Sequence, residues 1–255
     1  MSVEVERKFV CDSQVLEKLK DIGAVCLGQN EFKDQYFDSA DFTLTLKDFW
    51  LRKREGSWEL KRPAASHLNA EKRAQDVCTK YREITEVLQI RAELIAVMGI
   101  STERTSDSLQ TEQSKDVHAE FEKWLQDLKL ECFAEFTTVR CSYALGYEGD
   151  DRKVRVDLDQ ADFGYCVGEI EVLVSEGDEM TSAMQYIEKT AQKLGTQWIT
   201  GCVKCNMNSK VKVGQNARKV LKNKDVAVKI KNVRWMRNTD CFKKDGLPSI
   251  FSCGV

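Results

Sequence analysis

Histidine is scarce in this sequence, because the 255 residues include only His67 and His118. Two histidines are too few for a histidine-based metal centre or a Ser-His-Asp type triad. No run of about 18 or more apolar residues occurs, so no transmembrane helix is expected. The first residues, MSVEVERKFV, lack the apolar core of a signal peptide and the Arg-rich character of an organelle presequence. These absences argue against secreted, membrane-spanning and His-rich metalloenzyme classes.

The ten cysteines have no regular spacing, and the chain is too long to depend on disulfides. We expect reduced thiols and a cytoplasmic location. Cys202 and Cys205 form a single CxxC pair without a second pair or a suitably placed histidine, so no zinc site is expected. The composition, with 42% hydrophobic and 31% charged residues, is that of an ordinary globular protein with enough apolar side chains for a sizeable core.

Charge divides the chain into two parts. Residues 201–255 hold 13 Lys and Arg but only 3 Asp and Glu, a balance of +10. The first 200 residues hold the other 26 Lys and Arg and 38 Asp and Glu, a balance of −12. We therefore expect one domain over residues 1–200 and a basic, partly disordered segment over residues 201–255. Such a segment could also dock onto the acidic body, or reach toward nucleic acid or acidic membranes.

Hydrophobic periodicity in the first 200 residues indicates an α+β fold, in which short strands are flanked by helices. Polar, irregular stretches at 63–80 and 101–115 indicate loops. Four helices are expected, over about 12–23, 86–99, 116–128 and 181–195. The expected strands lie at 3–10, 32–37, 49–55, 57–62, 80–87, 131–145, 152–159 and 165–175.

The polar faces of these strands repeatedly carry charged pairs. Side chains alternate across a strand, so residues two apart share a face. Glu4, Glu6 and Lys8 share one face, opposite Val3 and Val5. The same alternation places these charged and aromatic residues on the polar faces of five further strands: Trp50, Arg52 and Arg54; Glu59 and Lys61; Arg140, between Val139 and Cys141; Arg155, Asp157 and Asp159; Glu169 and Glu171. An ordinary half-exposed sheet with a solvated face is the simplest interpretation of one strand. Repetition over six strands favours a closed sheet with a charged tunnel.

The two signs of charge in such a tunnel suit two kinds of ligand. Clustered carboxylates without histidine or cysteine favour Mg²⁺, with Mn²⁺ as a second choice, because these ions prefer oxygen ligands. The lysines and arginines suit phosphate oxygens, and their number suits several phosphates better than one. A divalent metal beside a polyphosphate is the arrangement of phosphoryl transfer.

The same residues resemble a known family. Glu4-Val5-Glu6-Arg7-Lys8 matches the ExExK signature of the CYTH, or triphosphate tunnel metalloenzyme, superfamily. The resemblance extends in order over residues 3–195, through FKDQYFD, FWLRKRE, WELK, RVDLD, and ADFGY followed by GEIE. It implies a closed eight-stranded antiparallel barrel with flanking helices. Within the superfamily, the branch that hydrolyses thiamine triphosphate with Mg²⁺ is the most similar.

The resemblance also implies roles for individual residues. The metal-side carboxylates are Glu4, Glu6, Asp157, Glu169 and Glu171, with Glu169 also next to the substrate. The triphosphate cradle is Lys8, Arg52, Arg54, Lys61 and Arg140. Glu83 and Asp159 are secondary candidates, since Asp159 could instead orient a neighbouring base.

Aromatic residues could supply specificity and help the reaction. Trp50 shares a face with Arg52 and Arg54, so its ring could stack on a cationic thiazolium, an interaction that contributes about 0.5–2 kcal/mol. Tyr36 and Lys61 are candidates for activating the attacking water. The alternatives are that Trp50 is a core or tunnel-mouth residue and that Tyr36 only packs.

The end of the chain departs from the family. The family follows its last helix with a further strand that supplies an inward lysine, and residues 196–255 show no match to it. Lys204 or Lys210 could replace that lysine, and without the strand the barrel could be left open at an edge. The functional alternatives are therefore an inorganic tripolyphosphatase, a class IV adenylyl cyclase, or a polyphosphate-binding module with impaired catalysis. We expect a monomer that binds neither membrane nor nucleic acid, although the basic segment leaves nucleic acid open.

Overall fold

The computed structural model describes residues 2–64, 79–100, 117–147, 150–175, 180–196 and 198. The expectations for the loop segments 65–78 and 101–116, and for the basic segment 201–255 with Lys204 and Lys210, lie outside the described residues. His67 and the Cys202–Cys205 pair lie outside them as well.

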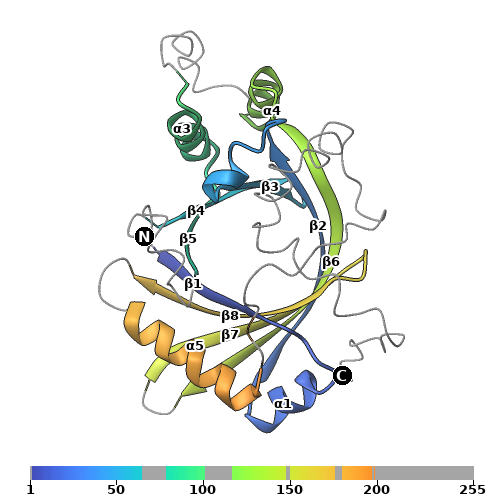
Figure 1. The fold of residues 1–255 in the computed structure, drawn as a ribbon, viewed down its shortest axis with the longest axis vertical. Helices are drawn as coiled ribbons and strands as arrows, with labels where there is room; N and C mark the ends of the chain where they lie inside the picture. Colours follow the sequence, from blue (N-terminus) through green and yellow to red (C-terminus); the bar gives the residue numbers. More distant parts are fainter. Residues whose placement is uncertain are drawn as a thin grey trace.

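Eight antiparallel strands form a closed barrel (Figure 1). Their order around the barrel is β1-β5-β4-β3-β2-β6-β7-β8, and β8 returns to β1. The expected closed α+β barrel is therefore confirmed. The strands are β1 (Ser2–Phe9), β2 (Val25–Asp38), β3 (Trp50–Arg54), β4 (Ser57–Pro63), β5 (Thr79–Ile84), β6 (Glu131–Tyr147), β7 (Asp150–Ala161) and β8 (Cys166–Ser175).

Helices cover two parts of the outer surface (Figure 1). The helices are α1 (Val15–Asp21), α3 (Val87–Met98), α4 (Val117–Asp127) and α5 (Met180–Leu194), with a short 3₁₀ turn, η1 (Thr45–Lys47). α1 and α5 lie beside β7 and β8, while α3 and α4 lie together beyond β3 and β4. Glu86 caps α3, because its carboxylate accepts the backbone N–H groups of Leu88 and Gln89, and Gly99 ends the helix in the left-handed region.

The barrel is closed by β1, which pairs with strands on both sides. Along β8, Glu6 lies opposite Glu171 and Lys8 lies opposite Glu169; along β5, Glu4 lies opposite Tyr81. The alternative of a barrel left open at an edge is not what the structure shows, because β1 joins β5 to β8.

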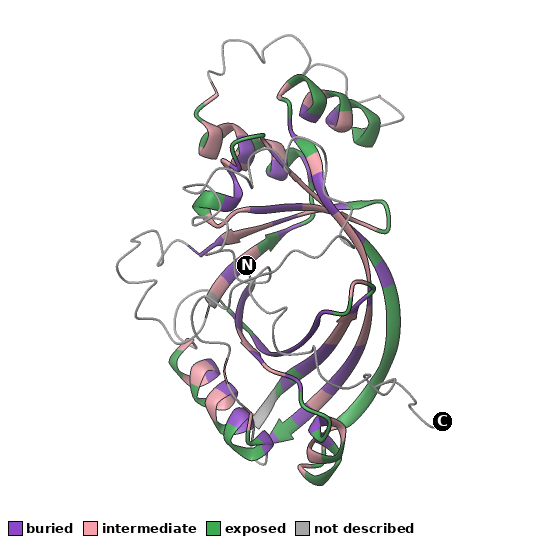
Figure 2. Cartoon of the chain, turned by 45° about the vertical axis from the view of Figure 1, so that its right-hand side comes forward, coloured by how far each residue is buried: buried purple, intermediate pink, exposed green. Residues whose placement is uncertain are grey.

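Buried residues occur along the strands and in the helices that cover them (Figure 2), and the two largest hydrophobic clusters lie between the barrel wall and these helices. One apolar cluster joins the outer faces of β1, β6, β7 and β8 to α1 and α5; a second joins β3, β4 and β5 to α3 and α4. The ring of Phe9, which is fully buried, lies against Gly168 on the neighbouring strand, so that a Cβ at residue 168 would lie 2.1 Å from the ring. Burying the outward faces under helices leaves the inward faces free to carry charge.

The structure extends one strand beyond its expected bounds. β2 begins at Val25 rather than near residue 32, and it pairs with β6 along almost its whole length. Residues 25–31 are exposed on both faces, and a register shift lies between Cys26 and Gly28. A strand without a buried face has no alternating hydrophobic pattern, which is why the sequence did not indicate it.

Candidate active site

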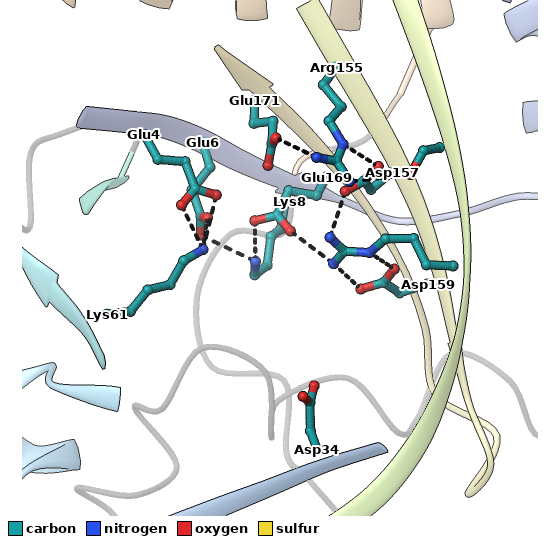
Figure 3. Close-up of polar contacts among 12 residues, drawn as sticks. Glu4, Glu6, Lys8, Asp34, Lys61, Arg155, Asp157, Asp159, Glu169 and Glu171 are labelled. Carbon is teal, nitrogen blue, oxygen red and sulfur yellow. Dashed lines mark hydrogen bonds and ion pairs between the residues drawn. The ribbon is translucent and has the colours of Figure 1, made fainter. Parts of the chain in front are cut away.

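The inward side chains of all eight strands line a cavity of about 450 Å³ inside the barrel. The alternation seen in the sequence holds for most inward positions, where residues two apart on one strand reach the same cavity, but Asp157 is fully buried and does not line it. Figure 3 shows the acidic cluster and its cationic partners on one side and Asp34 across the cavity. The charged part of this lining forms two chemically different regions, a carboxylate wall and an arginine wall.

The carboxylate wall consists of Glu4 and Glu6 on β1 and Glu169 and Glu171 on β8. All four side chains are buried, with Glu6 only 2% exposed. Oxygen atoms of Glu4, Glu6 and Glu169 lie within 4.8 Å of one another. Three buried carboxylates at this spacing offer the oxygen ligands that a hard divalent cation prefers. The residues present therefore fit a metal ion.

Two lysines lie among these acids (Figure 3). Lys61 Nζ lies 2.9 Å from Glu4 and 3.0 Å from Glu6, and Lys8 Nζ contacts Glu6 at 3.2 Å and also Glu169. Burial alone would raise the pKa of Glu6, but the charges of Lys61 and Lys8 outweigh it and hold that pKa below its usual value. Burial likewise opposes the charge of Lys61, and Glu6 and Glu4 nevertheless raise its pKa well above the usual value. The ammonium groups are therefore protonated at neutral pH.

The carboxylate wall still holds more negative than positive charge. Burial, together with the neighbouring Glu4 and Glu169, raises the pKa of Glu171 to about 9. The half-exposed Arg155 offsets this only in part, at 3.5 Å from the Glu171 carboxylate. The Glu171 carboxyl group therefore keeps its proton at neutral pH.

The arginine wall is defined by Arg52 and Arg54 on β3 and Arg140 on β6. Both Asp34 oxygens accept hydrogen bonds from Arg54 at 2.7 Å, and the two residues are opposite each other in the β2–β3 register. Arg140 is bound in the same bidentate way by its cross-strand neighbour Asp159, at 2.6 and 2.7 Å. Arg52 donates to its cross-strand neighbour Glu59 at 2.6 Å and to Glu83 at 3.2 Å. Register therefore fixes each guanidinium.

The Phe32 ring lies near two of these guanidinium groups. It lies 3.8 Å from the guanidinium carbon of Arg54 and 5.5 Å from that of Arg140. The aromatic face favours both cations, so two like charges can lie near one ligand position. The arginine wall is consequently pre-organised by carboxylates and by one shared ring.

Asp157 is placed differently from the other expected metal ligands. Its side chain is fully buried, and its oxygens accept hydrogen bonds from Arg140 at 2.6 Å and Arg155 at 2.9 Å. It is not among the three carboxylates that lie within 4.8 Å of one another. A metal-ligand role for Asp157 stays a prediction, and the observed contacts make it a link between the two walls.

The expected aromatic residues lie at the cavity surface. Trp50 is 9% exposed and meets Tyr36 edge to face, with ring centroids 6.4 Å apart. Tyr36 also stacks on Phe136 at 5.7 Å. Burial and the neighbouring Asp34 raise the pKa of Tyr36, so its hydroxyl is protonated at neutral pH. Tyr36 is thus suited to donating a hydrogen bond rather than to accepting a proton.

The sequence reasoning missed several lining residues. Phe32 and Asp34 share the inward face of β2 with Tyr36 and were not named, whereas Glu59 and Arg155 were placed on charged faces without a role. The i, i+2 alternation through Phe32, Asp34 and Tyr36 was the signal that could have identified them. The structure brings all the other expected site residues together at this cavity: Glu4, Glu6, Lys8, Tyr36, Trp50, Arg52, Arg54, Lys61, Glu83, Arg140, Asp159, Glu169 and Glu171.

Such a barrel, with acids and bases divided over its inner surface, defines the class of triphosphate-binding tunnel proteins that the sequence resembles. The CYTH domain family matches residues 2–204, and the chain belongs to this family. Two relatives named thiamine-triphosphatase, from Macaca fascicularis and Homo sapiens, are each 36% identical over 197 residues, covering 76% of this chain and 77% of the relative.

Solved structures resemble the chain more distantly. The PH1819 protein from Pyrococcus horikoshii OT3 is 19% identical and covers 76% of this chain and 92% of that chain, with a TM-score of 0.48. A Hippeastrum protein described by its dominant triphosphatase activity is 19% identical over 80% of this chain and 93% of that chain, with a TM-score of 0.42.

Proposed function

We propose that this protein is a Mg²⁺-dependent hydrolase that converts thiamine triphosphate to thiamine diphosphate and phosphate inside its barrel. The observation that carries the proposal is that one cavity contains both kinds of group. Buried carboxylates lie within 4.8 Å of one another, and arginines are held by cross-strand acids. The 36% identity to two thiamine-triphosphatases supports this substrate.

The metal would be held by Glu4, Glu6 and Glu169, with Glu171 and Asp157 as further candidates. Bound there, Mg²⁺ would neutralise phosphate charge and polarise the phosphate oxygens. Mn²⁺ prefers the same oxygen ligands and is the second choice. The lysines beside these acids keep the cavity from being purely negative, so a polyanion can approach the carboxylate side.

The chain's own cations would bind and orient the triphosphate. Arg52, Arg54 and Arg140 each offer fixed N–H donors, and Lys8 and Lys61 offer ammonium groups nearer the acids. Phosphoryl transfer through a loose transition state depends mainly on positioning and on neutralising charge. A cavity whose cations are already in place supplies both without rearrangement.

Lys61 and Tyr36 would orient the attacking water rather than act as strong bases. Both groups carry their proton at neutral pH, because the pKa of Lys61 and that of Tyr36 are raised. Each can therefore donate a hydrogen bond, Lys61 from Nζ and Tyr36 from its phenolic oxygen, to a water or to a phosphate oxygen. The loose transition state needs little proton removal before the P–O bond breaks.

Trp50 favours thiamine triphosphate over inorganic tripolyphosphate, which has no ring to stack. The indole lies on the inward face of the same strand as Arg52 and Arg54, next to the phosphate-binding side chains. A polyphosphate-binding module without turnover is the second candidate. It follows from the expected absence of the family's last inward lysine, a prediction that concerns residues outside the described part.

The proposal also places the protein in the cytoplasm as a monomer, with thiamine triphosphate as its partner and without nucleic acid. Among the described residues, no helix is long and apolar enough to cross a membrane. The domain division into residues 1–200 and the basic segment 201–255 remains part of the proposal.

The test is phosphate release by the full chain from thiamine triphosphate, tripolyphosphate and ATP, each with Mg²⁺ and with a chelator. We expect Mg²⁺-dependent release that is fastest from thiamine triphosphate. Faster release from tripolyphosphate would contradict the substrate assignment. Binding of thiamine triphosphate without release from any substrate would favour the binding module.

A further inference from the structure

Asp48 lies behind the cavity wall, directly after the 3₁₀ turn η1 and two residues before Trp50. One carboxylate oxygen, Oδ1, accepts two hydrogen bonds from cavity-lining side chains. Trp50 Nε1 donates one at 3.1 Å, and the Tyr81 hydroxyl donates the other at 2.9 Å. Trp50 belongs to β3 and Tyr81 to β5, so Asp48 joins two strands across β4, which lies between them.

The backbone of Asp48 adopts the left-handed conformation. Its φ is +66°, in the left-handed region that most residues with a side chain avoid. Its N–H donates to the Thr45 carbonyl at 3.0 Å, which ends the turn and directs the carboxylate toward the barrel. Aspartate tolerates this conformation better than most residues, so the end of the turn can hold a carboxylate at this position.

We infer that Asp48 is a positioning residue for Trp50 and thereby determines specificity for a cationic aromatic ring at the end of the polyphosphate. The inference rests on the proposed function, because it concerns how the same cavity selects its substrate. Asp48 is not among the described residues that line the cavity, so it acts through Trp50 and Tyr81.

Two physical effects follow from the shared carboxylate oxygen. First, the hydrogen bond fixes the rotation of the indole, and the edge-to-face contact with Tyr36 at 6.4 Å supports the ring from the side. Second, an anion that accepts the indole N–H increases electron density on the ring face, which strengthens its attraction for a cation. Both effects act on a ring ligand and leave a bare phosphate chain unaffected.

The positions of Trp50 and Tyr81 connect recognition of the ring to the groups that would bind the phosphates and the metal. Trp50 lies opposite Lys61 in the β3–β4 register, and Tyr81 lies opposite Glu4 in the β1–β5 register. Lys61 Nζ is 5.7 Å from the centre of the Tyr81 ring. A ring held on Trp50 would therefore place the attached phosphates beside Lys61 and the carboxylate wall, and Asp48 sets the distance at which that happens.

The experiment compares the wild-type chain with D48G, D48N and K129G. D48G removes the carboxylate, and glycine suits the left-handed backbone; D48N keeps an acceptor oxygen and also tolerates that backbone. Lys129 is exposed and has a φ of +57°, so K129G makes a matched change away from the cavity. The readouts are KM and kcat for thiamine triphosphate and for tripolyphosphate, and the thermal stabilisation of the chain by each ligand.

We expect D48G to raise KM for thiamine triphosphate on the order of tenfold, with the tripolyphosphate KM unchanged. D48N should recover most of the loss and keep a two- to threefold deficit, roughly the part due to charge. K129G should match the wild type. If D48G raises KM for thiamine triphosphate and for tripolyphosphate by the same factor, or changes neither value, Asp48 is not a specificity residue.

Ligand binding separates this inference from the proposed function. If no substrate releases phosphate but thiamine triphosphate stabilises the wild type more than D48G, hydrolysis is contradicted and the role of Asp48 is supported. If the wild type turns over thiamine triphosphate and D48G does so with the same selectivity, the function stands and the inference is overturned. A chain that neither ligand stabilises would overturn both.

Discussion

The two walls of the cavity are organised in opposite ways. In the arginine wall each guanidinium has a carboxylate partner fixed by strand register, as Arg54 has Asp34 and Arg140 has Asp159. In the carboxylate wall the acids crowd one another, and burial together with Glu4 and Glu169 raises the pKa of Glu171 to about 9. The arginine wall is satisfied before any ligand arrives, while the carboxylate wall gains most from an added cation.

The difference assigns a separate task to each wall. Pre-oriented arginines bind phosphate oxygens without reorganisation, which is the property that transition-state stabilisation requires. Crowded buried carboxylates are costly to keep ionised, so a divalent cation recovers that cost on binding. Changes in the carboxylate wall should therefore affect metal dependence, whereas changes in the arginine wall should affect substrate affinity.

The largest expected effect comes from E6Q. Glu6 contacts both Lys8 and Lys61 and belongs to the cluster of three carboxylates, so its loss removes a metal ligand and frees two ammonium groups. A metal's contribution of several kcal/mol predicts a fall in kcat/KM on the order of 10³-fold. Steady-state phosphate release measures it. E120Q, at an exposed position on α4, is the control, and near-normal activity of E6Q would refute the metal assignment.

The next effect is a pH dependence of stability that comes from Glu171. Its pKa of about 9 in the folded chain exceeds the ordinary value of 4.5, so between these values the folded state binds one more proton than the unfolded state. Stability is therefore greatest below pH 4.5 for this group and falls as pH rises toward 9, by at most about 1.4 kcal/mol per pH unit.

Urea unfolding at pH 6 and pH 8 in the presence of a chelator measures this slope. E171Q should flatten it, and E120Q should keep it. An identical slope in the wild type and E171Q would show that the carboxylate wall is not crowded enough to hold a proton.

A smaller effect is expected from D34N in the arginine wall. The substituted side chain would be of similar size but would lack the charge that binds Arg54 through two 2.7 Å hydrogen bonds. Charge-assisted bonds of this kind are worth about 1.5–3 kcal/mol, so we expect KM to rise about tenfold or more while the Mg²⁺ requirement stays unchanged. D41N, at an exposed position near the same strand, should have no effect on KM. A change in the Mg²⁺ concentration that D34N requires would contradict the assignment of metal binding to the carboxylate wall alone.

The smallest effect concerns the packing of β1 on β8, the two strands that carry the carboxylate wall. A Cβ at residue 168 would lie 2.1–2.5 Å from three atoms of the Phe9 ring, whereas a Cβ at Gly146 would meet nothing within 4 Å. G168A should destabilise the chain by about 1 kcal/mol or more and lower the melting temperature by roughly 2–4 °C. G146A should leave the melting temperature near that of the wild type. Equal melting temperatures for the two variants would contradict the close packing of β1 on β8.

Much of the inner surface was predictable because a closed sheet turns one alternating face inward everywhere. The pattern Glu4, Glu6, Lys8 and the pattern Trp50, Arg52, Arg54 each gave the correct face from sequence alone. Alternation says which side chains share a face but not which strand is the neighbour. Alternation with Tyr36 could have placed Asp34 on the inward face, but its pairing with Arg54 depends on the β2–β3 register and was not predictable.

Three other features could not be predicted from the sequence, each for a physical reason. The first half of β2 is exposed on both faces, so residues 25–31 show no hydrophobic period. The sequence pattern also does not show which carboxylates lie together. Asp157 and Glu169 have the same alternation on their strands, but only Glu169 belongs to the carboxylate cluster. Asp48 follows a 3₁₀ turn rather than lying on a strand, so no periodicity indicates its contact with Trp50.

The most direct test of the two-wall account is a Mn²⁺ titration of the wild type, E6Q and D34N, followed by electron paramagnetic resonance of the free ion. The account predicts that the wild type and D34N bind Mn²⁺ with the same affinity, while E6Q binds it far more weakly. Equal weakening in D34N and E6Q, or unchanged binding in E6Q, would contradict the division of the cavity into a metal wall and a phosphate wall.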